Sequence, residues 1–206
     1  CVPGGFPFDH HRLTLTGQYY QPDAVTLLAP CRPSKIVAVG LNYRSHAAEI
    51  RMPLPDEPLL FLKPSTAVIG PNGVIVYPPM SRRVDYEAEL GVIISAAAKN
   101  VSERDARRYI LGYTCFNDVT ARDLQRRDGQ WTRGKGFDTF CPLGPWIETE
   151  FDPADVLITC RVNGELRQMA TTRDLLFGIP QLIAFISSVM TLEAGDVILT
   201  GTPAGV

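Results

Sequence analysis

Three acidic residues alternate with apolar residues in the segment 84–94, and this spacing is the strongest sign of chemistry in the chain. Asp85, Glu87 and Glu89 fall at every second position, so a single strand would carry their carboxylates on one face and an apolar stripe on the other. Carboxylates about 6–7 Å apart on one strand repel each other unless a cation or solvent screens them. A bound metal ion is one interpretation, and an amphipathic strand with a wet polar face is the other.

A further carboxylate lies at the end of a second strand-like segment. Residues 111–117 are apolar and rich in β-forming types, Asp118 ends the run, and a polar segment that can begin a helix follows. Asp118 can therefore join Glu87 and Glu89 at one site. An all-oxygen ligand set of this kind suits a hard divalent ion, Mg²⁺, Mn²⁺ or Ca²⁺, better than zinc.

Two further pairs of polar residues have helical spacing. Arg122 and Gln125 are three apart, so a helix would place both on one face, where the guanidinium could bind a carboxylate through two parallel hydrogen bonds. His46 and Glu49 are also three apart and follow Ser45, which can cap a short helix. A carboxylate that orients a histidine makes it a competent base for activating water. The alternatives are a polar surface helix and a lone surface histidine.

Composition and charge narrow the class of protein. The chain has 206 residues, 45% of them hydrophobic, which is enough to bury a sizeable core. A net charge of −2 and scattered basic residues predict no binding to nucleic acid, and no apolar run approaches the roughly 20 residues of a membrane span. Five cysteines without a CxxC spacing indicate a reduced, cytoplasmic location, with Cys115 and Cys160 as small core residues.

The elements that must position these residues are mostly strands. Residues 1–33 are rich in Pro and Gly and predict a small N-terminal appendage with His10 and His11 at its surface and short strands at 13–16 and 25–28. Residues 34–206 form the second predicted unit. Its expected elements are a buried strand 35–40, helices over 102–111 and 175–190, a hairpin strand 158–162 followed by Asn163-Gly164, and a strand 197–200.

Six short motifs in this second unit resemble the fumarylacetoacetate hydrolase family and occur in that family's order. They are Val39-Gly40-Leu41-Asn42-Tyr43-Arg44-Ser45-His46, Phe61-Leu62-Lys63-Pro64-Ser65, Asp85-Tyr86-Glu87-Ala88-Glu89-Leu90, Asn117-Asp118-Val119-Thr120-Ala121-Arg122-Asp123, Lys135-Gly136-Phe137-Asp138 and Thr200-Gly201-Thr202-Pro203. The resemblance implies an α+β, mostly β architecture, a rolled mixed β-sheet with short decorating helices. Family members usually continue into further strands, so it also implies that the C-terminal end of the domain is incomplete at Val206.

The resemblance implies roles for individual residues. Arg122 and Gln125 would hold the oxo-acid end of a substrate, and Thr202 would contact its carboxylate, although a plain turn is the alternative for Thr202. Lys135 would face the metal site and stabilise a developing enolate, the alternative being an exposed loop lysine. Lys63 would either shape the site or serve the fold.

The resulting hypothesis is a Mg²⁺- or Mn²⁺-dependent enzyme that acts on a small 2-oxo acid, with Glu87, Glu89 and Asp118 as metal ligands. Because family members that cleave C–C bonds use a His–Glu pair on a lid, His46 and Glu49 favour hydrolysis of an acylpyruvate or fumarylpyruvate-type substrate through an enolate whose charge the metal accepts. Oxaloacetate decarboxylation and 2-hydroxyhepta-2,4-diene-1,7-dioate isomerisation are alternatives. A non-enzymatic member with a structural metal is the alternative of another class, and family precedent implies a homodimer.

Overall fold

The computed structural model describes residues 17–206, so His10, His11 and the predicted strand 13–16 lie outside the described residues. The strands are β1 (Ile36–Gly40), β2 (Leu59–Lys63), β3 (Val68–Ile69), β4 (Val84–Asp85), β5 (Ala88–Ile94), β6 (Ile110–Asn117), β7 (Thr120–Ala121), β8 (Cys141–Glu148), β9 (Leu157–Val162), β10 (Glu165–Thr171) and β11 (Val197–Leu199). The helices are α1 (Arg44–Glu49), α2 (Arg122–Asp128), α3 (Thr132–Lys135) and α4 (Ile179–Val189), with 3₁₀ helices η2 (Pro22–Ala24), η3 (Ser65–Ala67), η4 (Ala106–Tyr109) and η5 (Thr172–Asp174).

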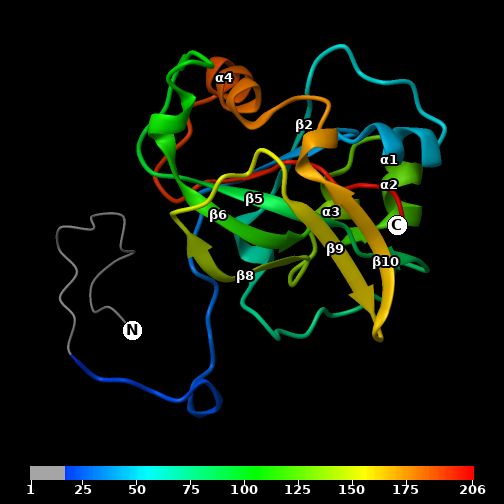
Figure 1. The fold of residues 1–206 in the computed structure, drawn as a ribbon. Coiled ribbons are helices and arrows are strands. Elements are labelled where there is room, and N and C mark those ends of the chain that lie inside the picture. The colour runs from blue at the N-terminus through cyan, green and yellow to red at the C-terminus, as the bar shows by residue number, and fades with distance from the viewer. Residues whose placement is uncertain (1–16) are drawn as a thin grey trace.

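One mixed sheet organises the described chain, in the strand order β2-β1-β11-β5-β6-β8-β3. The β1/β11 and β3/β8 pairs are parallel and the other pairs are antiparallel. Two smaller sheets, β9/β10 and β4/β7, flank it. Figure 1 shows α4 on one side of this sheet. The helices α1, α2 and α3 lie apart from α4, near residue 206, which is marked C. The predicted mostly β architecture with a curled mixed sheet is confirmed.

Alternate residues of the central strands pack into two separate cores. On β1, Val37 and Val39 face the core that contains Leu182 and Ile186 of α4, whereas Ile36 and Ala38 face the opposite core. Ordinary strand geometry explains this, because successive side chains point to opposite faces. The interior of β5 is consequently buried on both faces, and the alternative of a wet polar face for this segment is wrong.

Several predicted elements differ from the structure. Segment 84–94 is not a single strand, because β4 ends at Asp85 and β5 begins at Ala88, so Glu87 lies in the break between two sheets. Residues 25–28 form no strand, and 102–111 form only a turn and η4 before β6. The predicted helix 175–190 begins later, at Ile179, beside the proline that favours a first helical turn.

Neither of the two cysteines that the sequence predicts as core residues is fully buried. Cys115 is exposed on β6 rather than buried as predicted, and Cys160 is half-buried.

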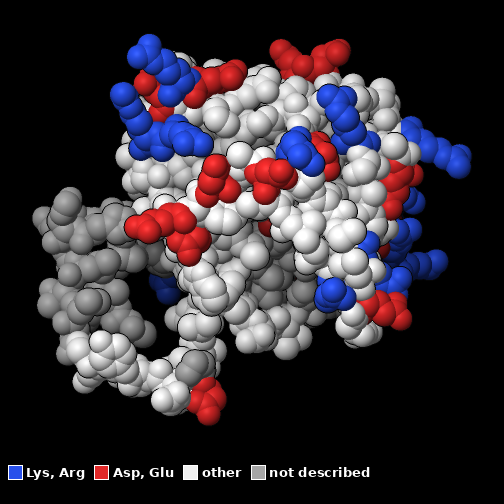
Figure 2. Space-filling model, in the orientation of Figure 1, with Lys and Arg blue, Asp and Glu red and all other residues white. Residues whose placement is uncertain are grey.

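On the face shown in Figure 2, acidic and basic side chains are interspersed over the described residues. Among the helices of residues 17–206, none combines the length and hydropathy of a membrane span.

A buried carboxylate joins the starts of the two parallel strands β1 and β11. Asp196 is fully buried and accepts hydrogen bonds from the backbone N–H groups of Ser34 and Lys35 at 3.1 Å and of Glu193 at 2.8 Å. The Ser34 hydroxyl donates to it at 2.7 Å, and the Lys35 ammonium forms an ion pair with it. The Asp196 side chain therefore fixes the position of β1 against β11, and with it the route of the chain into α1.

We expect Asp196→Ala to lower the free energy of unfolding by about 3 kcal/mol, since it leaves several N–H donors and an ammonium group without their acceptor. Denaturant unfolding followed by circular dichroism measures this loss. The matched control is Glu165→Ala, which removes an exposed partner of Arg167 and should change stability by less than about 0.5 kcal/mol. Equal unfolding midpoints for the Asp196 variant and the wild type would show that this contact does not hold the strands.

Candidate metal and substrate site

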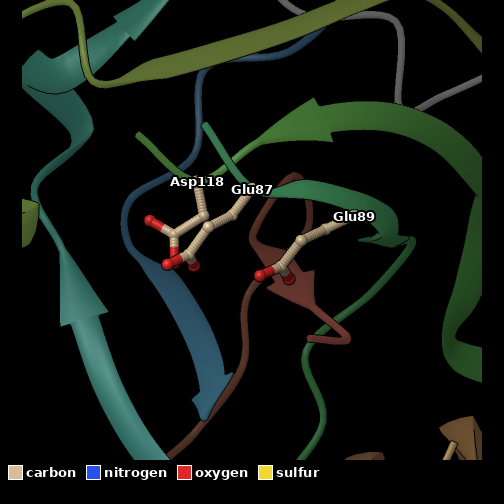
Figure 3. Close-up of side chains that lie close together, drawn as sticks. All are labelled: Glu87, Glu89 and Asp118. Atoms are coloured by element: carbon tan, nitrogen blue, oxygen red, sulfur yellow. The ribbon is translucent and has the colours of Figure 1, made fainter. Parts of the chain in front are cut away.

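Three buried carboxylates converge between the end of β6 and the start of β5. Glu87, Glu89 and Asp118 each offer an oxygen, and these oxygens all lie within 4.8 Å of one another. Figure 3 shows the Glu87 and Asp118 carboxylates next to each other, with Glu89 beside them. The structure therefore brings together the three residues that the sequence predicts as metal ligands.

Backbone contacts hold the cluster in place. The Glu87 N–H donates to the Asn117 side-chain oxygen at 3.0 Å, and the Asp118 N–H donates to the Glu87 carbonyl at 2.9 Å. The Glu89 carboxylate accepts the Gly201 N–H at 2.7 Å. Gly201 has φ of +100°, and a Cβ at this position would lie 2.8 Å from the Asn42 side chain. Only glycine fits this turn without strain.

Cationic side chains surround two of the three carboxylates. Lys135 donates to Glu87 at 2.8 Å and to Asp118 at 2.5 Å, and Lys63 forms a buried ion pair with Asp118. Arg122 forms a buried ion pair with the other Glu87 oxygen. Glu89, by contrast, has no ion pair with a lysine or arginine among residues 17–206.

These contacts shift the pKa values in opposite directions. Burial would raise the pKa of Glu87, but Lys135 and Arg122 outweigh it and lower this pKa to about 2. Burial raises the pKa of Glu89 well above its usual range, and the nearby Asp118 and Glu87 raise it further. Burial would lower the pKa of Lys135, but Asp118 and Glu87 raise it overall. Glu89 is thus the carboxylate that most lacks a positive charge.

The donor set fits a divalent cation. All three side chains supply oxygen, and a hard ion such as Mg²⁺ or Mn²⁺ favours carboxylate oxygen. A cation bound among them would supply the charge that Glu89 lacks and would offset the repulsion that raises its pKa. Asp85, also considered from the sequence, does not belong to this set, because it pairs with Arg83 at 2.9 Å and with Arg122 at 2.8 Å.

A cavity of about 400 Å³ opens over this cluster. Its charged and polar lining comprises Glu87, Glu89, Asp118, Arg122, Gln125, Arg126, Lys135, His46 and Thr202. Phe61 and Trp131 form part of the apolar wall, with ring centroids 5.1 Å apart in an edge-on arrangement. The Lys135 ammonium lies 4.9 Å from the centroid of Phe61. The cavity combines a carboxylate cluster with aromatic walls, as small-molecule sites commonly do.

The predicted histidine pair is present on α1. The Nδ1 atom of His46 lies 3.2 Å from a Glu49 carboxylate oxygen, and His46 lines the cavity. Ser45 does not cap α1 as predicted, because Tyr43 occupies the N-cap position. The Ser45 hydroxyl instead accepts the Ala204 N–H at 3.4 Å, and the second Glu49 oxygen accepts the Gly205 N–H at 3.0 Å. The backbone of Ala204 and Gly205 thus holds α1 at the cavity.

The remaining predicted residues also lie at the cavity or beside it. Arg122 and Gln125 both line the cavity and are joined by a 2.7 Å hydrogen bond. Their contact with substrate stays a prediction. Lys135 ends α3 and is buried, so the alternative of an exposed loop lysine is wrong. Lys63 is buried behind Asp118 and is not part of the lining. The Thr202 hydroxyl already bonds to the protein, donating to the Ala88 carbonyl at 2.9 Å.

Sequence reasoning missed one residue that supports the site. Gln168 lies on β10, is 1% exposed, and accepts the Ala88 N–H at 2.9 Å, between the two glutamate ligands. Its amide nitrogen donates to the Thr202 hydroxyl at 2.8 Å and to the Pro203 carbonyl at 2.9 Å. Gln168 therefore joins β5 to the turn that contacts Glu89. No local pattern could reveal it, because every partner is at least 34 residues away.

We expect Gln168→Met to lower the affinity for a divalent ion by about 10–100-fold, the range for lost groups that orient metal ligands. Methionine keeps the volume but cannot accept the Ala88 N–H or donate to Thr202. Isothermal titration of the metal-free protein with Mn²⁺ measures the change, and Arg167→Gln on the exposed side of the same strand is the control. Unchanged affinity in both variants would limit Gln168 to a packing role.

The sequence of this chain matches a known protein family. A family model described as fumarylacetoacetate (FAA) hydrolase C-terminal matches residues 35–206. The chain is 58% identical over 203 residues to an uncharacterized protein of Archaeoglobus fulgidus, covering 98% of this chain and 81% of that protein. It is 47% identical over 188 residues to the mitochondrial oxaloacetate tautomerase FAHD2B of Bos taurus, covering 88% of this chain and 60% of that protein.

A solved structure gives the same result. The crystal structure of 2-hydroxyhepta-2,4-diene-1,7-dioate isomerase from Mycobacterium marinum matches with a TM-score of 0.86 and 48% sequence identity. The match covers 93% of this chain and 72% of that chain. The family model, the relatives and the fold agree with the six motifs. The chain belongs to the fumarylacetoacetate hydrolase family.

Proposed function

We propose that this chain is a divalent-metal-dependent enzyme that moves a proton at the carbon next to the oxo group of a small 2-oxo acid. The observation that carries the proposal is the cluster of Glu87, Glu89 and Asp118 in the floor of a cavity that His46 also lines. The reaction class is keto–enol tautomerisation or double-bond isomerisation. The names of the bovine tautomerase and the mycobacterial isomerase support this class, since both reactions move a proton next to a carbonyl group.

In this proposal the polar residues of the site have separate roles. A divalent ion held by the three carboxylates would act as a Lewis acid that stabilises negative charge on the substrate. His46 takes the proton from carbon and delivers it to the oxo oxygen in tautomerisation, or to another carbon of the substrate in isomerisation, and Glu49 orients the imidazole through the 3.2 Å contact with Nδ1. Lys135, paired with Glu87 and Asp118, holds these two ligand carboxylates in place and contributes to the low pKa of Glu87.

Hydrolysis of an acylpyruvate is the second candidate. It begins with the same base, because a histidine oriented by a carboxylate can activate water as well as remove a proton from carbon. It requires in addition a water molecule placed at the acyl carbon. Oxaloacetate decarboxylation and a purely structural metal site are the remaining alternatives, and both predict that His46 contributes little.

Proton exchange with solvent tests the proposal directly. Metal-free protein is supplied with Mg²⁺ or Mn²⁺ in D₂O, and oxaloacetate, acetylpyruvate and a hydroxylated dienoic diacid are followed by NMR. We expect catalysed deuterium incorporation at the carbon beside the oxo group, which EDTA abolishes. Cleavage into pyruvate and a second acid would favour the hydrolase. If the protein catalyses no deuterium exchange and consumes none of these acids, an enzyme of this class is ruled out.

A further inference from the structure

One cationic residue of the cavity is unlike the others. Arg126 lines the cavity from α2, yet it is exposed, and no hydrogen bond or ion pair to its guanidinium is present among residues 17–206. Arg122 and Lys135, the other two cationic lining residues, are buried and paired with carboxylates. Arg126 is therefore free to bind an anion that enters the cavity.

The charges around the metal-ligand cluster favour an anionic ligand. Four carboxylates and four cationic side chains lie together there: Asp85, Glu87, Glu89 and Asp118 with Lys63, Arg83, Arg122 and Lys135. With all of them ionised, the group has no net charge. A divalent ion would add two positive charges, and the carboxylate of a 2-oxo acid would offset one of them. Arg126 adds a further positive charge that has no counter-ion among residues 17–206.

The position of Arg126 places that charge away from the reacting end of the substrate. Arg122 and Arg126 are four residues apart on α2, so they lie on the same face about 6 Å apart along the helix axis. Arg122 contacts the metal-ligand carboxylate Glu87, whereas Arg126 lies one turn further on. Apolar side chains, Ile50, Met52 and Trp131, line the same cavity. An extended substrate could thus place its chain against apolar walls and a second acid group at Arg126.

We infer that Arg126 is a specificity-determining residue that binds a second, distal acid group, so that the site selects dianionic over monoanionic 2-oxo acids. This inference rests on the proposed function, and it places the first acid group at the divalent ion that Glu87, Glu89 and Asp118 would hold. Arginine suits the role because its guanidinium can bind a carboxylate through two parallel hydrogen bonds and is always charged. Because the residue is exposed, the selectivity should weaken as salt rises.

Two acids that differ only at the distal end test the inference without turnover. 2-Oxoglutarate carries a carboxylate where 2-oxopentanoate carries a methyl group, and isothermal titration of the Mg²⁺-loaded protein gives both dissociation constants. We expect the wild type to bind 2-oxoglutarate about 10-fold more tightly, and Arg126→Gln to abolish this preference without weakening 2-oxopentanoate binding. Arg126→Lys should retain part of the preference, and 1 M NaCl should reduce it to about one-third.

Arg127→Gln is the matched control, since Arg127 neighbours Arg126, does not line the cavity and pairs with Asp128 at 3.6 Å. It should retain the full preference. Equal affinity of the wild type for both acids, a preference that survives in Arg126→Gln, or equal weakening of both acids in that variant would overturn the inference while leaving the proposed function in place. Failure of the wild type to bind either acid would overturn both.

Discussion

Glu89→Gln is expected to abolish metal-dependent activity and at the same time to stabilise the metal-free protein. The amide still accepts the Gly201 N–H but cannot ionise to bind a divalent ion, so turnover should fall by about 10³-fold or more. The pKa of Glu89 is higher in the folded chain than in the unfolded chain, because burial and two neighbouring carboxylates disfavour its charge. Ionisation at neutral pH therefore costs the fold free energy, and glutamine removes that cost.

Thermal unfolding separates the two effects. Without metal, the Glu89→Gln variant should melt above the wild type, by about 2–4 °C for each kcal/mol of relieved repulsion. With Mg²⁺ or Mn²⁺, the wild type should gain stability and the variant should not. Glu165→Gln, at an exposed position, is the control for the chemical change. A variant that keeps its metal-induced gain would remove Glu89 from the ligand set.

Removal of the Asp118 carboxylate would be a poorer test. Asp118 pairs with Lys63 and Lys135, so its removal leaves two buried ammonium groups without a partner. Loss of one member of a buried ion pair costs about 3–5 kcal/mol. Loss of activity in Asp118→Ala would therefore confound metal binding with unfolding, whereas Glu89 has no cationic partner among residues 17–206 that its replacement would leave unpaired.

His46→Ala should lower the rate of proton transfer by about 10²–10⁴-fold, the range for a lost general base. Metal-assisted decarboxylation of oxaloacetate should fall much less, because release of CO₂ requires no proton to be taken from carbon. Glu49→Gln should lower proton transfer less than His46→Ala, since glutamine still accepts the Gly205 N–H but orients the imidazole less well. Deuterium exchange and pyruvate formation are measured on the same samples of oxaloacetate.

Glu57→Gln, on the exposed segment that follows α1, is the control for these variants. Equal losses of exchange and decarboxylation in His46→Ala would mean that α1 serves to bind substrate or cover the cavity. Unchanged exchange would show that His46 is not the base.

The convergence of Glu87, Glu89 and Asp118 could be predicted because these residues stand in short patterns in the sequence. Glu87 and Glu89 are two apart, and Asp118 ends an apolar run, so strand geometry and oxygen chemistry suffice to propose a shared ion. The helical spacing of His46 and Glu49 likewise predicts a contact that the structure contains. The parallel assignment of substrate contacts to Arg122 and Thr202, and the homodimer, stay predictions.

What could not be predicted depends on contacts between distant segments. The alternation from Asp85 to Glu89 suggested one strand, but β4 pairs with β7 and β5 pairs with β6, and the chain bends between them to direct Glu87 toward Asp118. Burial of Lys135 follows from its two carboxylate partners, and no local pattern records such pairing. Cys115 was wrongly placed in the core, because strand alternation alone does not say which face of β6 is covered.

The most direct test of the metal site is an electron paramagnetic resonance titration of the metal-free protein with Mn²⁺. Binding at Glu87, Glu89 and Asp118 predicts one bound ion per chain, a spectrum that changes when oxalate is added, and loss of the bound signal in Glu89→Gln. The change with oxalate reports that the ion keeps open positions for a 2-oxo acid mimic. Absence of a stoichiometric Mn²⁺ site, or an identical bound signal in Glu89→Gln, would contradict the metal-dependent function proposed for this chain.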